Sequence, residues 1–247
     1  MPRKPPEFYS EEFENQVVKV WKDRENLYGA EKVLLDKFLK DKKAKICDAG
    51  TGSGRIAFYL EEEGFEDIHG FDLSKRMIDE AEKKAGINTS KIGFRHADAC
   101  DLSLYPDNHF QYLVYLQQVL SMIPEDQLGE ALREAFRIGQ PGSIYIFSFM
   151  DWRARKYNPL LSLIVNSVRF FTFRKTSKYY LPELTLNGRF NKGFLSRNQH
   201  PIWWPKMEMV IPMLEETGFE IVTTHKQNEV SSGGKEYAFY LICSKKG

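Results

Sequence analysis

Cysteine is scarce in this sequence. The 247 residues contain only three, Cys47, Cys100 and Cys243, and no two of them form a Cys-x-x-Cys pair. The sequence therefore lacks the spacing of a structural zinc site or of a disulfide framework. Because unpaired cysteines are typical of reducing compartments, we expect a cytoplasmic protein without a metal centre.

Long apolar runs are also missing. No stretch reaches the roughly 20 apolar residues that a membrane-spanning helix needs. The opening Met-Pro-Arg-Lys-Pro-Pro has no apolar segment of the kind found in a secretory signal, so we expect none. An excess of one charge is absent too, because 35 basic and 34 acidic residues leave a net charge of +1. The average therefore predicts no generally cationic surface.

What the sequence does contain is an alternation of short apolar runs with amphipathic segments. Strands are predicted at 44–48, 68–72, 92–96, 112–116 and 143–149, and helices at 55–63, 75–85 and 125–138. Strands that alternate with helices favour a parallel, doubly wound α/β sheet. A helix at 206–216 is followed by strands at 219–224 and 236–244, which a polar loop at 227–235 joins into an antiparallel hairpin. The expected fold is a seven-stranded sheet with helices on both faces.

These elements divide the chain into four parts. Residues 1–43 are predicted to form an N-terminal helical cap, and residues 44–150 a ligand-binding core. Residues 151–205 are aromatic, basic and irregular, and are expected to form an insert after the fifth strand that covers the substrate. Residues 206–247 complete the core with a helix and the hairpin.

A glycine-rich loop follows the first predicted strand. It reads Asp48-Ala-Gly-Thr-Gly-Ser-Gly54. Glycines permit positive φ angles and let backbone N–H groups approach a ligand at the start of a helix. From Gly52 the loop also fits the relaxed dinucleotide pattern G-x-G-x-x-A. An acid directly before the glycines would repel a pyrophosphate, however, and would attract an ammonium and a sulfonium. This favours S-adenosylmethionine over a nicotinamide dinucleotide.

Polar groups after the following strands agree with this interpretation. Asp72 ends the second strand, where an acid accepts hydrogen bonds from ribose hydroxyls. Asp98 and Ala99 follow the third strand, where the carboxylate is placed to accept from an adenine amino group, and Met77 is placed to pack on the adenine face. Gln117 ends the fourth strand. The carboxyl ends of parallel strands meet at one edge, so we expect these residues to converge there.

The loop, the Phe-Asp-Leu-Ser segment around Asp72, the Ala-Asp-Ala segment around Asp98 and the terminal hairpin together resemble the class I, Rossmann-like S-adenosylmethionine-dependent methyltransferases. The resemblance covers residues 44–150 and 206–246, and implies the strand order 3-2-1-4-5-7-6 with strand 7 antiparallel. It also implies contacts of S-adenosylmethionine, and of the product S-adenosylhomocysteine, with Asp48, Gly50, Gly52, Asp72, Leu73, Asp98, Ala99 and Gln117. We add Thr51 and Met77 to these predicted cofactor contacts. Many small-molecule members carry a histidine pair where this chain has Leu120-Ser121-Met122.

The insert is expected to carry the acceptor. It holds ten basic and two acidic residues, a balance of +8, so the rest of the chain carries −7. Aromatic residues are interleaved with the cations, and we select Tyr157, Tyr180, Trp203 and Trp204 as substrate contacts. A basic, aromatic surface suits nucleic acid, an anionic or aromatic small molecule, or an anionic membrane surface.

Within the insert, residues 160–173 are apolar on nearly all sides and too short to span a bilayer. Three roles stay open: a lid helix over the core, an interfacial helix that makes weak membrane-surface contact through 160–175, and a contact in a homodimer. No dedicated nucleic-acid-binding module accompanies the insert.

For an oxygen acceptor a general base helps methyl transfer. The candidates are His200, which lies beside the two tryptophans of the insert, and Asp151, directly after the fifth strand. Tyr9 and Trp21 are candidates for closing over the cofactor. The predicted function is methyl transfer to an oxygen or nitrogen of an anionic, aromatic or apolar small molecule. The alternatives are a nucleic-acid methyltransferase that grips through the basic insert, and a non-catalytic S-adenosylmethionine-binding protein.

Overall fold

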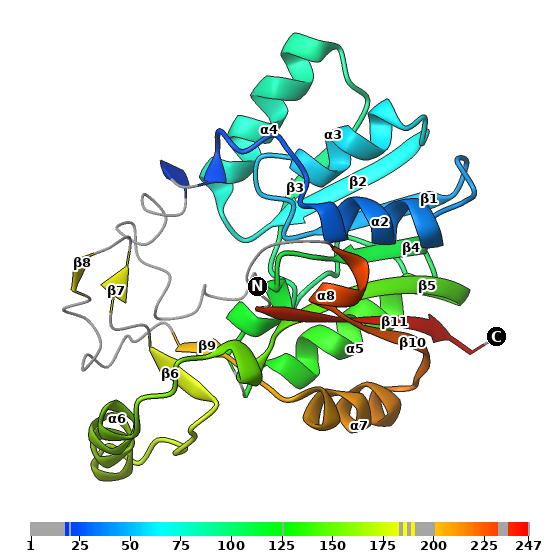
Figure 1. The fold of residues 1–247 in the computed structure, drawn as a ribbon. Coiled ribbons are helices and arrows are strands. Elements are labelled where there is room, and N and C mark those ends of the chain that lie inside the picture. Colours follow the sequence, from blue (N-terminus) through cyan, green and yellow to red (C-terminus); the bar gives the residue numbers. More distant parts are fainter. Residues whose placement is uncertain are drawn as a thin grey trace.

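A computed structural model describes residues 18–19, 21–124, 126–182, 185–186, 189–190, 201–231 and 237–246. Seven strands form one sheet in the order β10-β11-β5-β4-β1-β2-β3 (Figure 1). Their bounds are β1 Lys45–Ala49, β2 Asp67–Asp72, β3 Gly93–His96, β4 Phe110–Tyr115, β5 Gly139–Met150, β10 Phe219–Lys226 and β11 Ala238–Lys245.

Strands β1 to β5 pair in parallel, whereas β11 runs antiparallel to both β5 and β10. Counted as seven core strands, the order is 3-2-1-4-5-7-6, which confirms the predicted topology. All parallel strands therefore end at the same edge of the sheet, and the predicted site lies there.

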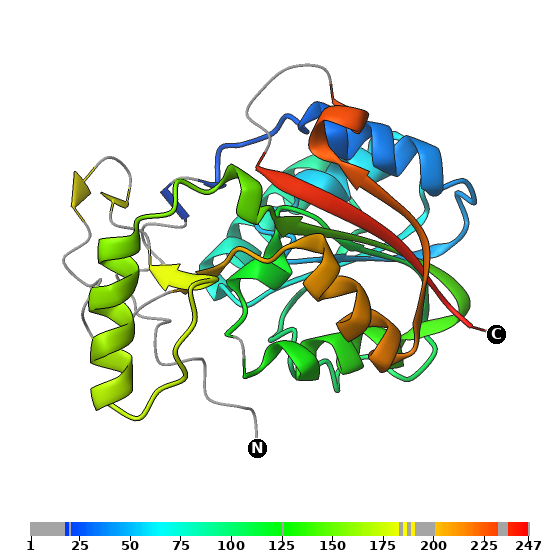
Figure 2. The ribbon, with the colours of Figure 1, turned by 60° about the horizontal axis from the view of Figure 1, so that its bottom comes forward.

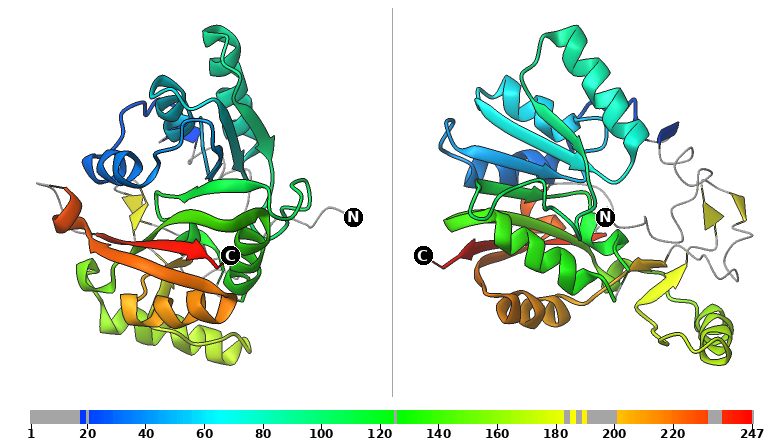
Figure 3. Two further views of the ribbon diagram at one scale, coloured as in Figure 1. Left: turned by 90° about the vertical axis from the view of Figure 1, so that its right-hand side faces the viewer. Right: turned by 180° about the vertical axis from the view of Figure 1, so that it is seen from behind.

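Helices cover both faces of the sheet (Figure 3). One face packs against α2 Gly29–Phe38, α3 Arg55–Glu62, α4 Lys75–Asn88 and the short α8 Gln227–Val230, and the other against α5 Leu128–Ile138 and α7 Met207–Thr217. Alternate residues of each strand serve the two faces. In β5, for example, Tyr145, Phe147 and Phe149 pack on the α5 side and Ile146 on the α3 side. Both faces of the sheet are thus buried, as the doubly wound prediction requires.

Several predicted boundaries differ from the structure. The helix expected at 125–138 starts only at Leu128, and a separate 3₁₀ turn, η1 Val119–Met122, precedes it. Strand β5 begins at Gly139, four residues before its predicted start at 143. The loop expected at 227–235 opens with helix α8, whose Gln227 side chain accepts from the Tyr237 N–H at the start of the returning segment. Local polarity suggested a loop, whereas contact with α2 holds this segment as a helical turn.

The insert is more regular than its sequence suggested. After the 3₁₀ turn η2 Trp152–Ala154 comes a helix, α6 Pro159–Phe171, and then β6 Tyr180–Pro182, which pairs antiparallel with β9 Pro201–Trp203. The short strands β7 Thr185–Leu186 and β8 Arg189–Phe190 form a further pair. The helix expected within residues 160–173 is confirmed by α6, whereas the pairing of β6 with β9 was not predicted because these strands lie far apart in the sequence. The insert projects from the edge of the sheet at which β5 ends, and α6 stands clear of the sheet (Figures 1 and 2).

No described helix is long and apolar enough to cross a membrane.

Candidate functional site

The glycine-rich loop between β1 and α3 is held in a conformation that only glycine adopts easily. Gly50, Gly52 and Gly54 have φ angles of +64°, +57° and +89°. A Cβ on Gly50 would lie 2.4 Å from Cγ2 of Val119, and one on Gly52 would lie 3.1 Å from Cε of Met77. The loop therefore has neither the backbone freedom nor the space for larger residues. The N–H groups of Thr51 and Gly54 already donate to the carbonyls of Phe71 and Thr51.

Asp48 lies beneath this loop with only 1% of its surface exposed. Its Oδ2 accepts a hydrogen bond of 2.6 Å from Thr51 Oγ1. Burial raises the pKa of Asp48 to about 7, and the Glu31 and Asp72 carboxylates add to the rise, although the Thr51 bond and the Arg55 guanidinium oppose it. Both residues were predicted to contact the cofactor. With a pKa of about 7, Asp48 is only partly ionised at neutral pH, and Thr51 covers it under the loop.

Asp72 ties the end of β2 to the glycine loop. Its Oδ2 accepts from the Gly52 N–H at 2.9 Å, and its Oδ1 accepts from the Ser74 N–H at 2.8 Å. The neighbouring Leu73 is half-buried, and its carbonyl accepts from His96 Nε2 at 2.9 Å.

Asp98 presents a buried acceptor atom. Its Oδ1 accepts from the Cys100 N–H at 2.9 Å, but Oδ2 is buried and has no hydrogen-bond partner in the described part of the chain. Such an atom is costly unless a ligand donates to it. Ala99 and Met77 are also buried, and Met77 lies against Gly52 of the glycine loop.

A buried ion pair that sequence reasoning missed joins the N-terminal part of the chain to this site. Glu31 of α2 and Arg55 of α3 form a two-pronged pair, Oε2 to Nη1 at 2.5 Å and Oε1 to Nη2 at 2.9 Å. Gln117, predicted to bind the cofactor, donates through Nε2 to Glu31 Oε1. Arg55 also donates to the Asn26 carbonyl at 3.0 Å. No local pattern links residues 31, 55 and 117, so only the tertiary structure reveals this network.

The segment after β4 is fixed by serine side chains. Gln117 and Gln118 both adopt positive φ angles, 58° and 57°. The Gln118 N–H donates to Ser148 Oγ at 2.8 Å, and Ser121 Oγ accepts from the Met150 N–H at 3.0 Å. These hydroxyls hold the end of β4 against β5. Ser121 is fully buried, and its bond is structural.

The segment before α2 crosses the glycine loop. The Lys22 carbonyl accepts from Ser53 Oγ at 3.1 Å and from Lys84 Nζ at 2.7 Å. Trp21, one residue earlier, is half-buried and has the Arg24 guanidinium over its ring. Its closure over a cofactor stays a prediction, and Tyr9 lies outside the described residues.

The insert residues predicted to bind substrate fall into two groups. Tyr180 and Trp203 are 3% and 4% exposed, their rings stack at 5.9 Å, and Tyr180 donates through its hydroxyl to the Ile123 carbonyl at 2.8 Å. Their observed role is to anchor the insert in the core. Tyr157 is exposed, and Trp204 has a buried Nε1 without a hydrogen-bond partner in the described part of the chain. Substrate contact by these four residues stays a prediction.

Of the two candidate bases, Asp151 is engaged in a cap. Its Oδ1 accepts from the Arg153 N–H at 2.9 Å at the start of η2, and the Arg153 side chain lies 3.8 Å away. His200 lies outside the described residues. A catalytic role for either base stays a prediction.

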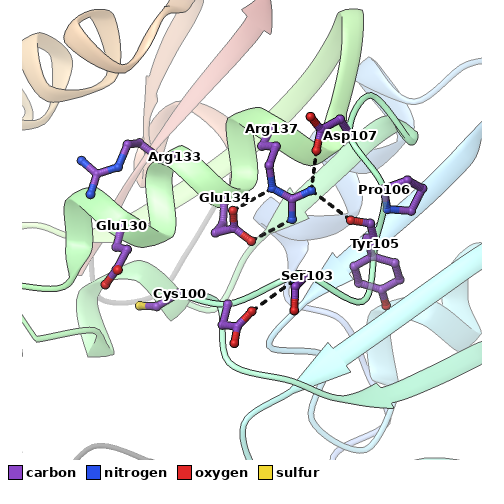
Figure 4. A pocket seen from close by; sticks show the side chains of 10 residues that line it. Cys100, Ser103, Tyr105, Pro106, Asp107, Glu130, Arg133, Glu134 and Arg137 are labelled. Carbon is purple, nitrogen blue, oxygen red and sulfur yellow. Dashed lines mark hydrogen bonds and ion pairs between the residues drawn. The ribbon is translucent and has the colours of Figure 1, made fainter. Parts of the chain in front are cut away.

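A separate hollow of about 490 Å³ lies between the segment that joins β3 to β4 and helix α5 (Figure 4). Arg137 fills its polar wall. The guanidinium donates to the Glu134 and Asp107 carboxylates and to the carbonyls of Leu102 and Tyr105 at 2.7–2.9 Å, which uses all five of its donors. Because these groups satisfy one another, the hollow is a structural junction between the loop and α5. No group of three metal-binding side chains occurs among the residues that the structure describes.

Comparison with known proteins now gives this geometry a context. Residues 46–142 match the family described as "Methyltransferase domain". This match runs from β1 into the start of β5 and contains the glycine loop, Asp72, Asp98 and Gln117. Comparison with curated proteins finds no match.

Solved structures share the fold at low sequence identity. The PH0226 protein from Pyrococcus horikoshii OT3 has a TM-score of 0.62 at 21% identity, over 98% of this chain and 94% of its own. A SAM-dependent methyltransferase from Methanosarcina mazei has a TM-score of 0.68 at 22% identity, over 90% and 99%. A Burkholderia thailandensis 1,6-didemethyltoxoflavin-N1-methyltransferase, solved with its substrate and S-adenosylhomocysteine, has a TM-score of 0.66 at 15% identity, over 100% and 93%. The likeness establishes the fold across nearly the whole chain.

Proposed function

We propose that the protein binds S-adenosylmethionine and transfers its methyl group to a small-molecule acceptor, since residues 46–142 match the family described as "Methyltransferase domain" and the fold is similar to that of a SAM-dependent methyltransferase. One observation carries the proposal. Carboxylates stand at the ends of the three adjacent strands β1, β2 and β3, around a loop of three left-handed glycines. Asp72 and Asp98, together with the partly ionised Asp48, make this edge acidic.

Each carboxylate suits a different part of the nucleoside. The charge of Asp48 lies under the loop, where it favours the ammonium and sulfonium of the amino-acid end. Asp72, at the end of β2, suits the ribose hydroxyls as a carboxylate acceptor. The unpaired Oδ2 of Asp98 is an acceptor for the adenine amino group, which would remove an otherwise unsatisfied buried atom. Leu73, Met77 and Ala99 supply apolar surface beside it.

A dinucleotide fits less well. A pyrophosphate at the glycine loop would face Asp48 and Asp72. Arg55, the basic residue at the start of α3, is not available to neutralise the charge of the pyrophosphate. Arg55 is already paired with Glu31 inside the protein, and only 9% of it is exposed. The like charges would oppose binding at short range, where the local dielectric is low.

The acceptor side follows from the position of the insert. Sulfonium chemistry supplies the electrophile, so the chain has only to place an oxygen or nitrogen in line with the methyl and exclude water. The insert rises from the edge at which β5 ends, and offers basic and aromatic groups for an anionic, aromatic or apolar acceptor (Figure 1). Asp151 and His200 are the candidate bases. Similarity in fold to an N1-methyltransferase of a small heterocycle supports this substrate class.

Titration calorimetry tests cofactor choice directly. We expect S-adenosylmethionine and S-adenosylhomocysteine to bind and NAD not to bind. Asp72→Ala should weaken binding about 100-fold, because it removes a charged acceptor from two hydroxyls, and Asp98→Ala about 10-fold. Asp79→Ala, at an exposed position on α4, is the matched control and should leave binding unchanged.

NAD binding in the absence of S-adenosylmethionine binding would refute the proposal. Transfer of labelled methyl to a panel of phenols, carboxylates, amines and RNA then separates the enzyme from its alternatives. Transfer to small molecules supports the proposed class, transfer to RNA alone refutes it, and cofactor binding without any transfer identifies a non-catalytic binder.

A further inference from the structure

Helix α6 of the insert has one buried side. Leu161 and Val165 pack with Leu181 of β6 in a small apolar cluster of their own. On the same side, Arg169 is 7% exposed and donates to the Tyr180 carbonyl at 2.5 Å. The helix is therefore fixed to the β6–β9 ribbon by a defined face, and its other side points away from that ribbon.

The other side of α6 is apolar and open to solvent. Leu160 and Leu163 are each 66% exposed, Phe171 is 79% exposed, and Phe173 just beyond the helix is 99% exposed. Ile164 and Phe170 are also exposed. Figure 2 shows α6 standing at the margin of the molecule, clear of the sheet and of α5 and α7. Large contiguous apolar surfaces of this kind mark contact sites rather than ordinary surface.

Charge around this surface has a single sign. From Trp152 to Pro182 the sequence contains no aspartate or glutamate. Lys156 lies exposed just before α6, and Arg174, Lys175 and Lys178 lie exposed just after it. The exposed apolar face is thus bounded by cations at both ends, although the chain as a whole is close to neutral.

We propose that α6 docks this protein on an anionic lipid surface. Leucine and phenylalanine side chains of the exposed face enter the boundary between headgroups and acyl chains, and the flanking cations contact the lipid phosphates. With 13 residues, α6 is suited to lie in the plane of the interface, and it does not span the bilayer. Docking does not depend on the methyl transfer proposed above.

A second copy of the chain is a poorer occupant of the same face. Two α6 helices packed face to face would bring cations of one copy next to cations of the other in either orientation, because the segment 152–182 that carries both helix ends contains basic residues and no acid. A lid role is also disfavoured, because α6 turns its buried face, with Leu161 and Val165, toward the β6–β9 ribbon, and the exposed apolar face points away from it. A lipid surface satisfies the apolar and the basic features together.

Vesicle flotation with the full chain tests the proposal. We expect binding to vesicles of phosphatidylcholine mixed with phosphatidylglycerol, little binding to phosphatidylcholine alone, and a decrease as salt rises. Leu163→Ser with Phe171→Ser, and separately Arg174→Glu with Lys175→Glu, should each lower the bound fraction about tenfold or more.

Matched controls change equally exposed residues elsewhere. Ile87→Ser on α4, where Ile87 is 74% exposed, and Lys83→Glu with Lys91→Glu should leave flotation unchanged. Unaltered thermal unfolding of every variant shows that the fold is kept. Equal binding to both vesicle types, no binding to either, or equal losses in the control variants would each overturn the proposal. So would a dimer, measured by light scattering, that Leu163→Ser with Phe171→Ser converts to monomer.

Discussion

The glycine-loop edge and the insert are neighbours, but they differ in how far their charged side chains are buried. At the loop, Asp48, Glu31 and Arg55 are buried and joined to protein groups. In the described part of the insert, most cations and several large apolar side chains lie on the surface, whereas Arg169 is buried and Tyr180 reaches the core. The comparison teaches that polar groups are enclosed where a small ligand of fixed shape is expected. Apolar and basic side chains are exposed to solvent where the proposed partner is a broad lipid surface.

Of the variants considered, one that breaks the buried ion pair should lower the free energy of unfolding most. Glu31→Gln leaves the Arg55 charge buried without its partner, so we expect a loss of about 3–5 kcal/mol in the free energy of unfolding. Denaturant titration measures it. Asp107→Asn, which breaks a pair whose carboxylate is 69% exposed, should cost less than about 1 kcal/mol. Equal losses in the two variants would show that the loop edge is no more enclosed than the surface.

The buried carboxylate of Asp48 should reveal itself through pH. Its pKa rises from 3.8 to about 7 on folding, so between these values the folded state keeps a proton that the unfolded chain has released. The stability contributed by this group is therefore lost as pH rises through that window. Asp48→Asn should be more stable than the native protein by roughly 2–4 kcal/mol at pH 8 and similar to it at pH 4. Urea titrations across this range test the difference, and one that is independent of pH would contradict it.

Glycine substitutions compare the closely packed glycine loop after β1 with an open turn. Gly50→Ala adds backbone strain and a collision with Val119, so we expect a loss of about 2–3 kcal/mol. Gly142 has a φ of +79° but no heavy atom within 4 Å of the place that a Cβ would occupy, so Gly142→Ala carries the backbone strain alone, about 1 kcal/mol. Thermal unfolding separates the two. If the additional Val119→Ala change recovers none of the Gly50→Ala loss, the collision is not the cause.

The smallest expected effect concerns how the insert is anchored. Tyr180→Phe leaves the Ile123 carbonyl without its donor and should cost about 1 kcal/mol. Tyr157→Phe removes a hydroxyl from an exposed ring and should change stability by less than about 0.5 kcal/mol. Denaturant titration of both variants measures the difference. A larger loss for Tyr157 would mean that the surface of the insert, rather than its buried anchor, holds it in place.

The sequence predicted the parts of the site that depend on local order along the chain. Strand, acid, glycine loop and helix follow one another within a few residues, and parallel strands bring Asp72 and Asp98 to the same edge. The fold follows for the same reason, since alternating strands and helices with a terminal hairpin allow few topologies.

The Glu31–Arg55 pair and the anchors of the insert could not be predicted in this way. Residue 31 reads as part of an amphipathic helix and residue 55 as a helix start, and neither shows a partner 24 positions away. From the sequence, Tyr180 and Trp203 were predicted to be substrate contacts in a basic, aromatic insert. The antiparallel pairing of β6 with β9 instead directs both into the core, and no short-range pattern specifies that pairing.

Strand β11 lies between β5 and β10 in the sheet, although it follows both in the chain. During translation, β5 and then β10 therefore leave the ribosome with open edges, and β10 has no other neighbour in the sheet. The apolar face of α6 emerges in the same interval. Exposed strand edges and apolar surface promote aggregation, so the nascent chain is most vulnerable between synthesis of residue 150 and synthesis of residue 245. Chaperones that bind nascent chains would therefore be needed most during this interval.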